Sequence, residues 1–199
     1  MNPSPPPPSR HFDLKDVPAS PWKNGGGTTR ELLSWPPGAP VFDWRVSVAT
    51  IAASGPFSAF PDVARQIMLL SGDGVALRGA GIDHRLTQPF QPFAFDGGVP
   101  VEGTLLGGTS VDFNVMAYQA AGVATLQVLS AHANGAPLAL AGAFGVALVL
   151  QGHWRLAGEP ACAGQGVRWT QPLPDPSAQA LTDGARLAWV QWHPLAQDA

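Results

Sequence analysis

A glycine-rich turn with polar neighbours is the segment whose residue types best suit ligand binding. Three consecutive glycines stand between Lys23-Asn24 and Thr28-Thr29. A glycine triplet loses more backbone entropy on folding than any other, so we expect a positive φ or a close backbone approach that a Cβ would obstruct. Two interpretations stay open: a ligand-contacting loop, and a turn that only reverses the chain. A Walker phosphate loop is excluded, because its lysine follows the glycines.

Charged and amide side chains on two alternating segments form a second group of candidates. Only 13% of the residues are charged, and a buried unpaired charge is costly, so charges on strand faces need a reason. In one interpretation Arg45 and Asp112 form a structural pair across the sheet. In the other, Arg45 or Arg65 grips a carboxylate while neighbouring amides and hydroxyls orient the ligand. The ligand-binding candidates are Lys23, Asn24, Thr28, Thr29, Arg45, Ser47, Arg65, Asp112 and Asn114.

Metal and nucleophile motifs are missing from the sequence pattern. None of the five histidines has another histidine or a glutamate two to four residues away, so we expect no metal and no cofactor. No G-x-S-x-G elbow or Cys-His pairing is present. The lone Cys162 permits no intrachain disulfide, which fits a reducing compartment. Glu31 and Asp112 stay as weak candidates for acid-base catalysis, against the simpler roles of cap or ion pair.

The elements that must position these residues are strands. The 23 glycines and 21 prolines favour many short strands and tight turns. Apolar and polar side chains alternate in residues 42–51 and 111–118, which predicts two strands, each with one apolar and one polar face. Similar segments at 67–79 and 147–158 each read as a hairpin, and they suggest two β-barrel halves. We therefore expect an antiparallel all-β fold.

Charge and tail composition exclude several partners. The net charge of −3 and the pI near 5.9 supply no basic face, so we expect neither nucleic acid nor an anionic membrane as a partner. No apolar run reaches the length of about 18 residues that a membrane helix needs. Residues 1–10 carry no secretory signal and are rich in proline, so we expect a disordered tail.

Four blocks together resemble the HutD/Ves family: PWKNGGGTTRE at 21–31, FDWRVS at 42–47, GPFSAFP at 55–61 and DFNVM at 112–116. The resemblance implies a cytoplasmic bacterial protein with a metal-free bicupin fold. Residues 11–199 would form one unit, with halves at approximately 11–120 and 121–199. It also implies a role in histidine utilisation, through binding of a carboxylate such as urocanate or a formylated glutamate derivative. The matching positions are Trp22, Lys23, Asn24, Gly25, Thr28, Thr29, Glu31, Trp44, Arg45, Ser47, Asp112 and Asn114.

One departure from the family pattern concerns the fourth block. Many relatives continue it with Met-x-Arg, whereas this chain has Met116-Ala117-Tyr118. The leading hypothesis is a small-molecule-binding bicupin with Arg45 as the main anion clamp, for which a homodimer is allowed. The rivals are an isomerase or hydrolase that uses Glu31 or Asp112 as acid or base, and a protein-interaction module that uses a β edge.

Overall fold

The chain forms two antiparallel β-sandwich halves of the cupin jelly-roll kind. The computed structural model describes residues 9–133 and 135–195, and in this part every regular element is a strand except one 3-10 helix, η1 (Leu14–Asp16). Each half has one large and one small sheet. Neither half closes into a continuous hydrogen-bonded barrel in the described residues. The expected all-β bicupin fold is confirmed.

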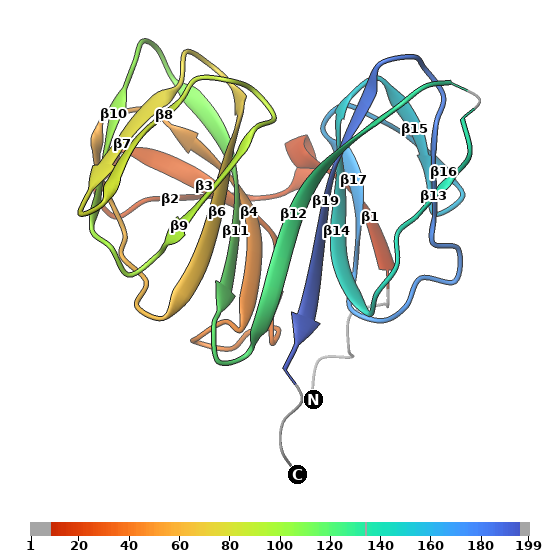
Figure 1. The fold of residues 1–199 in the computed structure, drawn as a ribbon, viewed down its shortest axis with the longest axis horizontal. Helices are drawn as coiled ribbons and strands as arrows, with labels where there is room; N and C mark the ends of the chain where they lie inside the picture. Colours follow the sequence, from red (N-terminus) through yellow and green to blue (C-terminus); the bar gives the residue numbers. More distant parts are fainter. Residues whose placement is uncertain (1–8, 134, 196–199) are drawn as a thin grey trace.

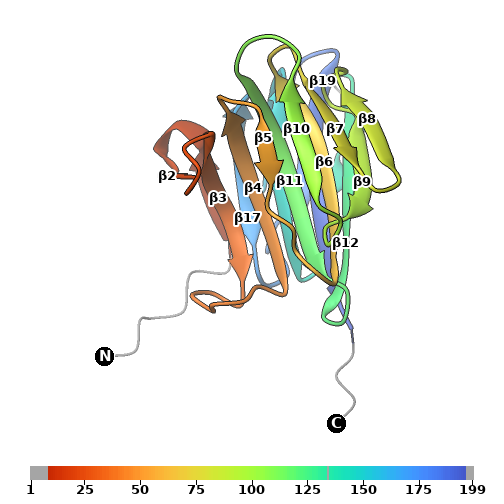
Figure 2. The same cartoon turned by 90° about the vertical axis from the view of Figure 1, so that its left-hand side faces the viewer.

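The first half carries the glycine-rich turn. Its large sheet has the order β2-β3-β4-β11-β6-β9 and its small sheet the order β5-β10-β7-β8. Figure 2 looks onto this half, with the small sheet in front of the large one. The strands are β2 (Ala19–Pro21), β3 (Gly27–Trp35), β4 (Trp44–Ile51), β5 (Gly55–Phe57), β6 (Val63–Ser71), β7 (Val75–Gly79), β8 (Ile82–Leu86), β9 (Pro92–Asp96), β10 (Val101–Leu105) and β11 (Ser110–Tyr118).

The second half repeats this plan. Its large sheet has the order β1-β17-β14-β19-β12 and its small sheet the order β13-β18-β15-β16. The strands are β1 (Ser9–Asp13), β12 (Gly122–Ala131), β13 (Leu138–Ala139), β14 (Phe144–Gln151), β15 (His153–Leu156), β16 (Glu159–Cys162), β17 (Gln165–Trp169), β18 (Ser177–Ala180) and β19 (Ala185–Pro194).

The two large sheets face each other in the middle of the molecule, and the small sheets lie outside them (Figure 1). The side chains between them form a shared apolar core that includes Trp44 and Val46 of β4, Phe113 of β11, and Val190 and Trp192 of β19. These side chains include the apolar face that the alternation predicted for residues 42–51 and 111–118. The polar face of β4 and β11 therefore turns away from the second half, into the interior of the first half.

The N-terminal strand crosses the expected boundary between the halves. Strand β1 pairs with β17 of the second half, from Ser9 opposite Trp169 to Asp13 opposite Gln165. Residues 11–13 thus belong to the second sheet system, although residues 11–120 were expected to form the first half. Most of the expected disordered tail, 1–8, lies outside the described residues, but its last two residues begin β1, which corrects that prediction.

The repeated segments are equivalent in the two halves but are not hairpins. Residues 67–79 run from β6 in a large sheet to β7 in a small sheet, and residues 147–158 run from β14 to β15 in the same way. Gly72 and Gly152 adopt positive φ values of 98° and 77° at the two crossings. A glycine is suited to this turn because it reaches φ > 0 without a Cβ clash.

Candidate functional site

The glycine-rich turn meets both backbone requirements predicted from its sequence. Gly25 has a φ of +70°. A Cβ on Gly27 would collide with the carbonyl oxygen of Thr50 on the adjacent strand. The turn is closed by the Trp22 N–H, which donates to the Gly27 oxygen at 2.9 Å, and by the Gly25 N–H, which donates to the Trp22 oxygen at 3.0 Å. The glycines therefore serve backbone geometry.

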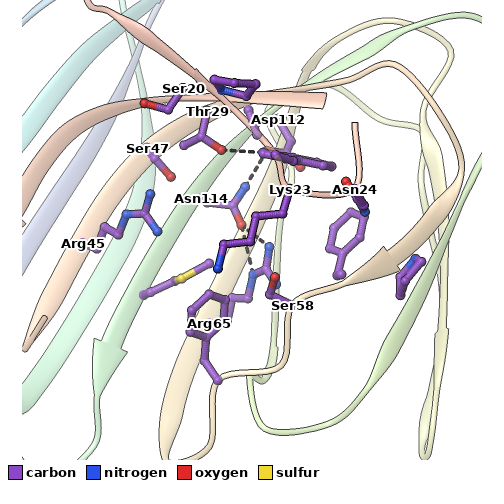
Figure 3. A pocket seen from close by; sticks show the side chains of 17 residues that line it. Ser20, Lys23, Asn24, Thr29, Arg45, Ser47, Ser58, Arg65, Asp112 and Asn114 are labelled. Carbon is purple, nitrogen blue, oxygen red and sulfur yellow. Dashed lines mark hydrogen bonds between the residues drawn. The ribbon is translucent and has the colours of Figure 1, made fainter. Parts of the chain in front are cut away.

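Two polar side chains of this segment also serve to hold the turn. The Gly26 N–H donates to Asn24 Oδ1 at 3.0 Å, an Asx turn of the kind that asparagine favours. The indole Nε1 of Trp22 donates to Thr29 Oγ1 at 2.7 Å. The side-chain ammonium of Lys23 has no hydrogen-bond partner or ion pair among residues 9–133 and 135–195. Figure 3 shows the Lys23 side chain pointing from the turn into a cavity.

This cavity has a volume of about 590 Å³ and lies between the turn and the inner face of the large sheet (Figure 3). Its walls include every predicted ligand-binding residue except Thr28. Successive side chains of a strand point to opposite faces, so Thr29 points inward and Thr28 outward. Thr28 therefore lies outside the cavity wall, which corrects its prediction as a ligand-binding residue. The cavity wall otherwise consists of Ser20, Pro21, Trp22, Ala49, Pro56, Phe57, Ser58, Phe60 and Met116.

A buried polar chain of three residues forms part of the cavity wall. Arg65 of β6 donates from Nε and Nη2 to Oδ1 of Asn114, at 3.0 and 2.8 Å. Asn114 Nδ2 in turn donates to Oδ1 of Asp112. Asp112 and Asn114 are two residues apart on β11, so both face the cavity. All three are buried, with exposed fractions of 7% for Arg65, 3% for Asn114 and 2% for Asp112.

Arg65 is a buried cation whose closest partners are neutral. Its guanidinium lies over the rings of Phe57 and Phe95, at 5.2 and 5.3 Å from their centroids. Among the described residues no carboxylate oxygen lies within 4.0 Å of its side-chain nitrogens. Burial lowers the pKa of Arg65 to about 10, and the Asp112 charge partly opposes this shift. The group stays a cation at neutral pH.

The same burial that lowers the pKa of Arg65 raises the pKa of Asp112. Burial raises the pKa of its carboxyl group to about 7, although Arg65, Asn114 and the Ala49 N–H all favour the charged form. Desolvation penalises the ionised carboxylate, and within the described part of the chain no cation is in contact with it to restore the balance. Asp112 is therefore partly protonated near neutral pH.

Arg45 is paired with Glu31 and not with Asp112. Its Nε donates to Glu31 Oε2 at 2.9 Å, and the Glu31 side chain is 49% exposed. The sheet register explains the difference, because Asp112 lies opposite Ala49, four residues along β4 from Arg45, a distance of roughly 13 Å along a strand. The predicted Arg45–Asp112 structural pair is wrong. Glu31 itself is not part of the cavity wall.

The aromatic part of the site was missed by sequence reasoning. Phe57 and Phe60 both line the cavity, and both belong to the GPFSAFP block, which supported the family resemblance but supplied no candidate site residue. Two phenylalanines three residues apart beside a proline were the available signal. Tyr118, at the position where many relatives have arginine, does not line the cavity.

The described residues contain no group of three or more His, Cys, Asp or Glu side chains placed to hold a metal ion. Within the same residues no helix has the length and apolar character needed to cross a bilayer.

Known proteins similar to this chain agree on one family. A family model described as HutD matches residues 14–184. Protein Ves of Citrobacter koseri is 37% identical over 186 residues, which cover 90% of this chain and 94% of that protein. Protein Ves of Cronobacter sakazakii is 35% identical over 166 residues, which cover 80% of this chain and 86% of that protein.

Solved structures extend this similarity to the fold. HutD from Pseudomonas fluorescens SBW25 has a TM-score of 0.80 at 26% identity, over 94% of this chain and 100% of that chain. A cupin 2 conserved barrel domain protein from Leptotrichia buccalis has a TM-score of 0.63 at 10% identity, over 92% and 96% of the two chains, which shows the shared fold alone. The sequence blocks, the bicupin architecture and the family match therefore agree: the chain belongs to the HutD family.

Proposed function

We propose that this protein binds a small carboxylate intermediate of histidine breakdown, such as urocanate or N-formylglutamate, and thereby tunes that pathway without a metal. The histidine-utilisation context comes from the HutD family. The ligand class comes from the chemistry of the cavity, which carries three basic side chains, Lys23, Arg45 and Arg65, in a chain whose net charge is −3.

The burial of the charged Arg65 side chain in the cavity wall is the observation that carries the proposal. A buried guanidinium stays charged, and it needs an anion or several acceptors to offset its desolvation. Asn114 supplies one neutral acceptor for Nε and Nη2. Nη1 has no hydrogen-bond partner among the described residues. A ligand carboxylate in the cavity would accept from this free edge of the guanidinium.

The main anion clamp is therefore assigned to Arg65 in place of Arg45. Arg45 already has a carboxylate partner in Glu31, which reduces its attraction for a second anion. Lys23 reaches into the cavity from the exposed turn and adds positive charge near the mouth. Trp22, Phe57 and Met116 offer the apolar surface that small-molecule sites combine with a few placed polar groups.

Isothermal titration calorimetry with urocanate and with N-formylglutamate tests the proposal. Arg65→Gln removes the charge but keeps hydrogen-bonding capacity, and we expect it to weaken binding by about 30-fold, which corresponds to the ~2 kcal/mol of a charge-assisted contact. The matched control is Arg78→Gln, because Arg78 is an exposed arginine paired with Asp83 on the outer sheet. Absence of heat with both compounds, or equal affinities in the two variants, would refute the proposal.

An acid-base enzyme remains the alternative, and one observation favours Asp112 over Glu31 for it. Asp112 lies in the cavity wall with a pKa of about 7, a value suited to proton transfer near neutral pH. Glu31 is half exposed and ion-paired. NMR of each compound incubated with the protein decides: product formation that Asp112→Asn abolishes supports an enzyme, and unchanged spectra overnight reject it.

A further inference from the structure

We propose that anion binding beside Arg65 is coupled to the uptake of one proton by the carboxyl group of Asp112. The inference rests on the proposed function, because it needs an anionic ligand in the cavity. It goes further by making the affinity of the site depend on pH through a residue that need not touch the ligand.

The geometry joins the two groups through one amide. Asn114 accepts from Arg65 with its oxygen and donates to Asp112 with its nitrogen, so both of its polar atoms are used (Figure 3). In the free protein the ionised form of Asp112 is the negative charge that offsets Arg65 across this amide. A ligand carboxylate on Arg65 would place a second negative charge near the same buried cation.

Few other charges are placed to offset this second negative charge. The charged side chains that share the cavity wall with Asp112 are Arg65 of β6, Arg45 of β4 and Lys23 of the turn. Arg45 is neutralised by Glu31 of β3, and Lys23 is exposed, so solvent screens it. On the small sheet across the cavity, strands β7 and β10 carry charges on exposed side chains that face outward, namely Arg78 and Glu102.

The carboxyl group of Asp112 is therefore the group that protonates when the anion arrives. Burial already raises its pKa to about 7, and a nearby anion raises it further because like charges disfavour ionisation. Well below pH 7 the free protein already carries this proton, and affinity is nearly constant. Above pH 7 the proton must be taken up, so affinity falls as the pH rises, by up to about tenfold per pH unit.

Calorimetry with N-formylglutamate from pH 6 to 8.5 tests the coupling. This probe is chosen because neither of its carboxyl groups nor its formylated nitrogen titrates in that range, whereas the imidazole of urocanate does. Titrations in HEPES and in Tris, whose ionisation enthalpies differ, measure the protons taken up per ligand bound. For a pKa that rises by about one unit on binding, we expect little uptake at pH 6, a maximum of about half a proton near pH 7.5, and binding that is weaker by nearly tenfold at pH 8.5 than at pH 6.

Two variants assign the proton. Asp112→Asn keeps the shape but cannot titrate, so its uptake should vanish and its affinity should become independent of pH. Glu102→Gln is the matched control, because it removes an exposed carboxylate that faces outward on the small sheet and should retain the uptake. Uptake that persists in Asp112→Asn would overturn the inference, since the proton would then go elsewhere.

The outcomes separate the coupling from the proposed function. No binding at pH 6 refutes the proposed function. Binding with a Kd constant within twofold from pH 6 to 8.5, and no proton uptake, overturns only the coupling. If Asp112→Asn does not fold or bind, carboxyl carbon NMR of the native protein decides: ligand saturation should raise the titration midpoint of Asp112 by at least about one pH unit, which matches the tenfold effect, and an unchanged midpoint refutes it.

Discussion

Gln66 links the two halves of the molecule through one side chain, and its loss should be costly. Gln66 lies on β6, on the face turned toward the second half. Its Nε2 donates to the Ala124 oxygen at 2.9 Å, and its Oε1 accepts from the Leu126 N–H at 3.2 Å. These two groups belong to the edge of β12 that does not pair with β19, so the amide substitutes for a neighbouring strand.

The substitution Gln66→Leu keeps the size of the side chain but removes both hydrogen bonds. Each bond contributes about 1 kcal/mol net, and a buried backbone group left without a partner costs about 1–3 kcal/mol. The Leu126 side is buried and the Ala124 side is half-buried, so water can satisfy part of the loss. We therefore expect the free energy of unfolding to fall by about 2–3 kcal/mol.

Urea denaturation followed by tryptophan fluorescence measures this change. The m-value should stay constant, because the surface exposed on unfolding is almost the same. The matched control is Gln127→Leu, an exposed glutamine on β12, which should change stability by no more than about 0.5 kcal/mol. Equal stabilities for the two variants would show that the Gln66 bridge does not hold the halves together.

Two further predictions concern the site without a ligand. The pKa of Asp112 is about 7 in the folded state and 3.8 in the unfolded state. The protonated side chain therefore adds to the free energy of unfolding in full below pH 3.8, and this contribution is lost as the pH rises to 7. Between pH 5 and 7 the stability of the native protein relative to Asp112→Asn should therefore fall by about 2–3 kcal/mol, and a constant difference in urea titrations would contradict the burial argument. Gly27→Ala should lower the free energy of unfolding by about 2 kcal/mol or more, because the added Cβ would meet the Thr50 oxygen. The control is Gly38→Ala, whose Cβ would meet no neighbour; its positive φ, like that of Gly25, should cost only about 1 kcal/mol. Similar melting temperatures for the two variants would argue against the close approach at Gly27.

The two alternating strands were the part of the site that could be predicted from the sequence. The period of two in residues 42–51 and 111–118 separates Trp44 and Phe113 from Ser47 and Asn114, whatever the surroundings are. It could not tell what each face meets. The polar face meets an internal cavity, and the apolar face meets the second half of the molecule.

Strand β3 shows why other elements were missed. Its register shifts between Glu31 and Leu33, so Leu32 and Leu33 are both buried. A bulge of this kind interrupts the alternation on which strand prediction depends. Strand β1 was missed for a different reason, because its pairing with β17 joins residues more than 150 positions apart, and no local pattern reports such a contact.

The sequence by itself determined the all-β class, the two-half architecture, the family and the backbone needs of Gly25 and Gly27, because periodicity, glycine stereochemistry and short motifs are local properties of the chain. Only the tertiary structure decided which charges meet. The register places Glu31 beside Arg45, leaves Arg65 with a neutral amide, and isolates Asp112 from direct contact with a cation. Burial and pairing determine how a charged group behaves, and both depend on contacts between strands that are distant in sequence.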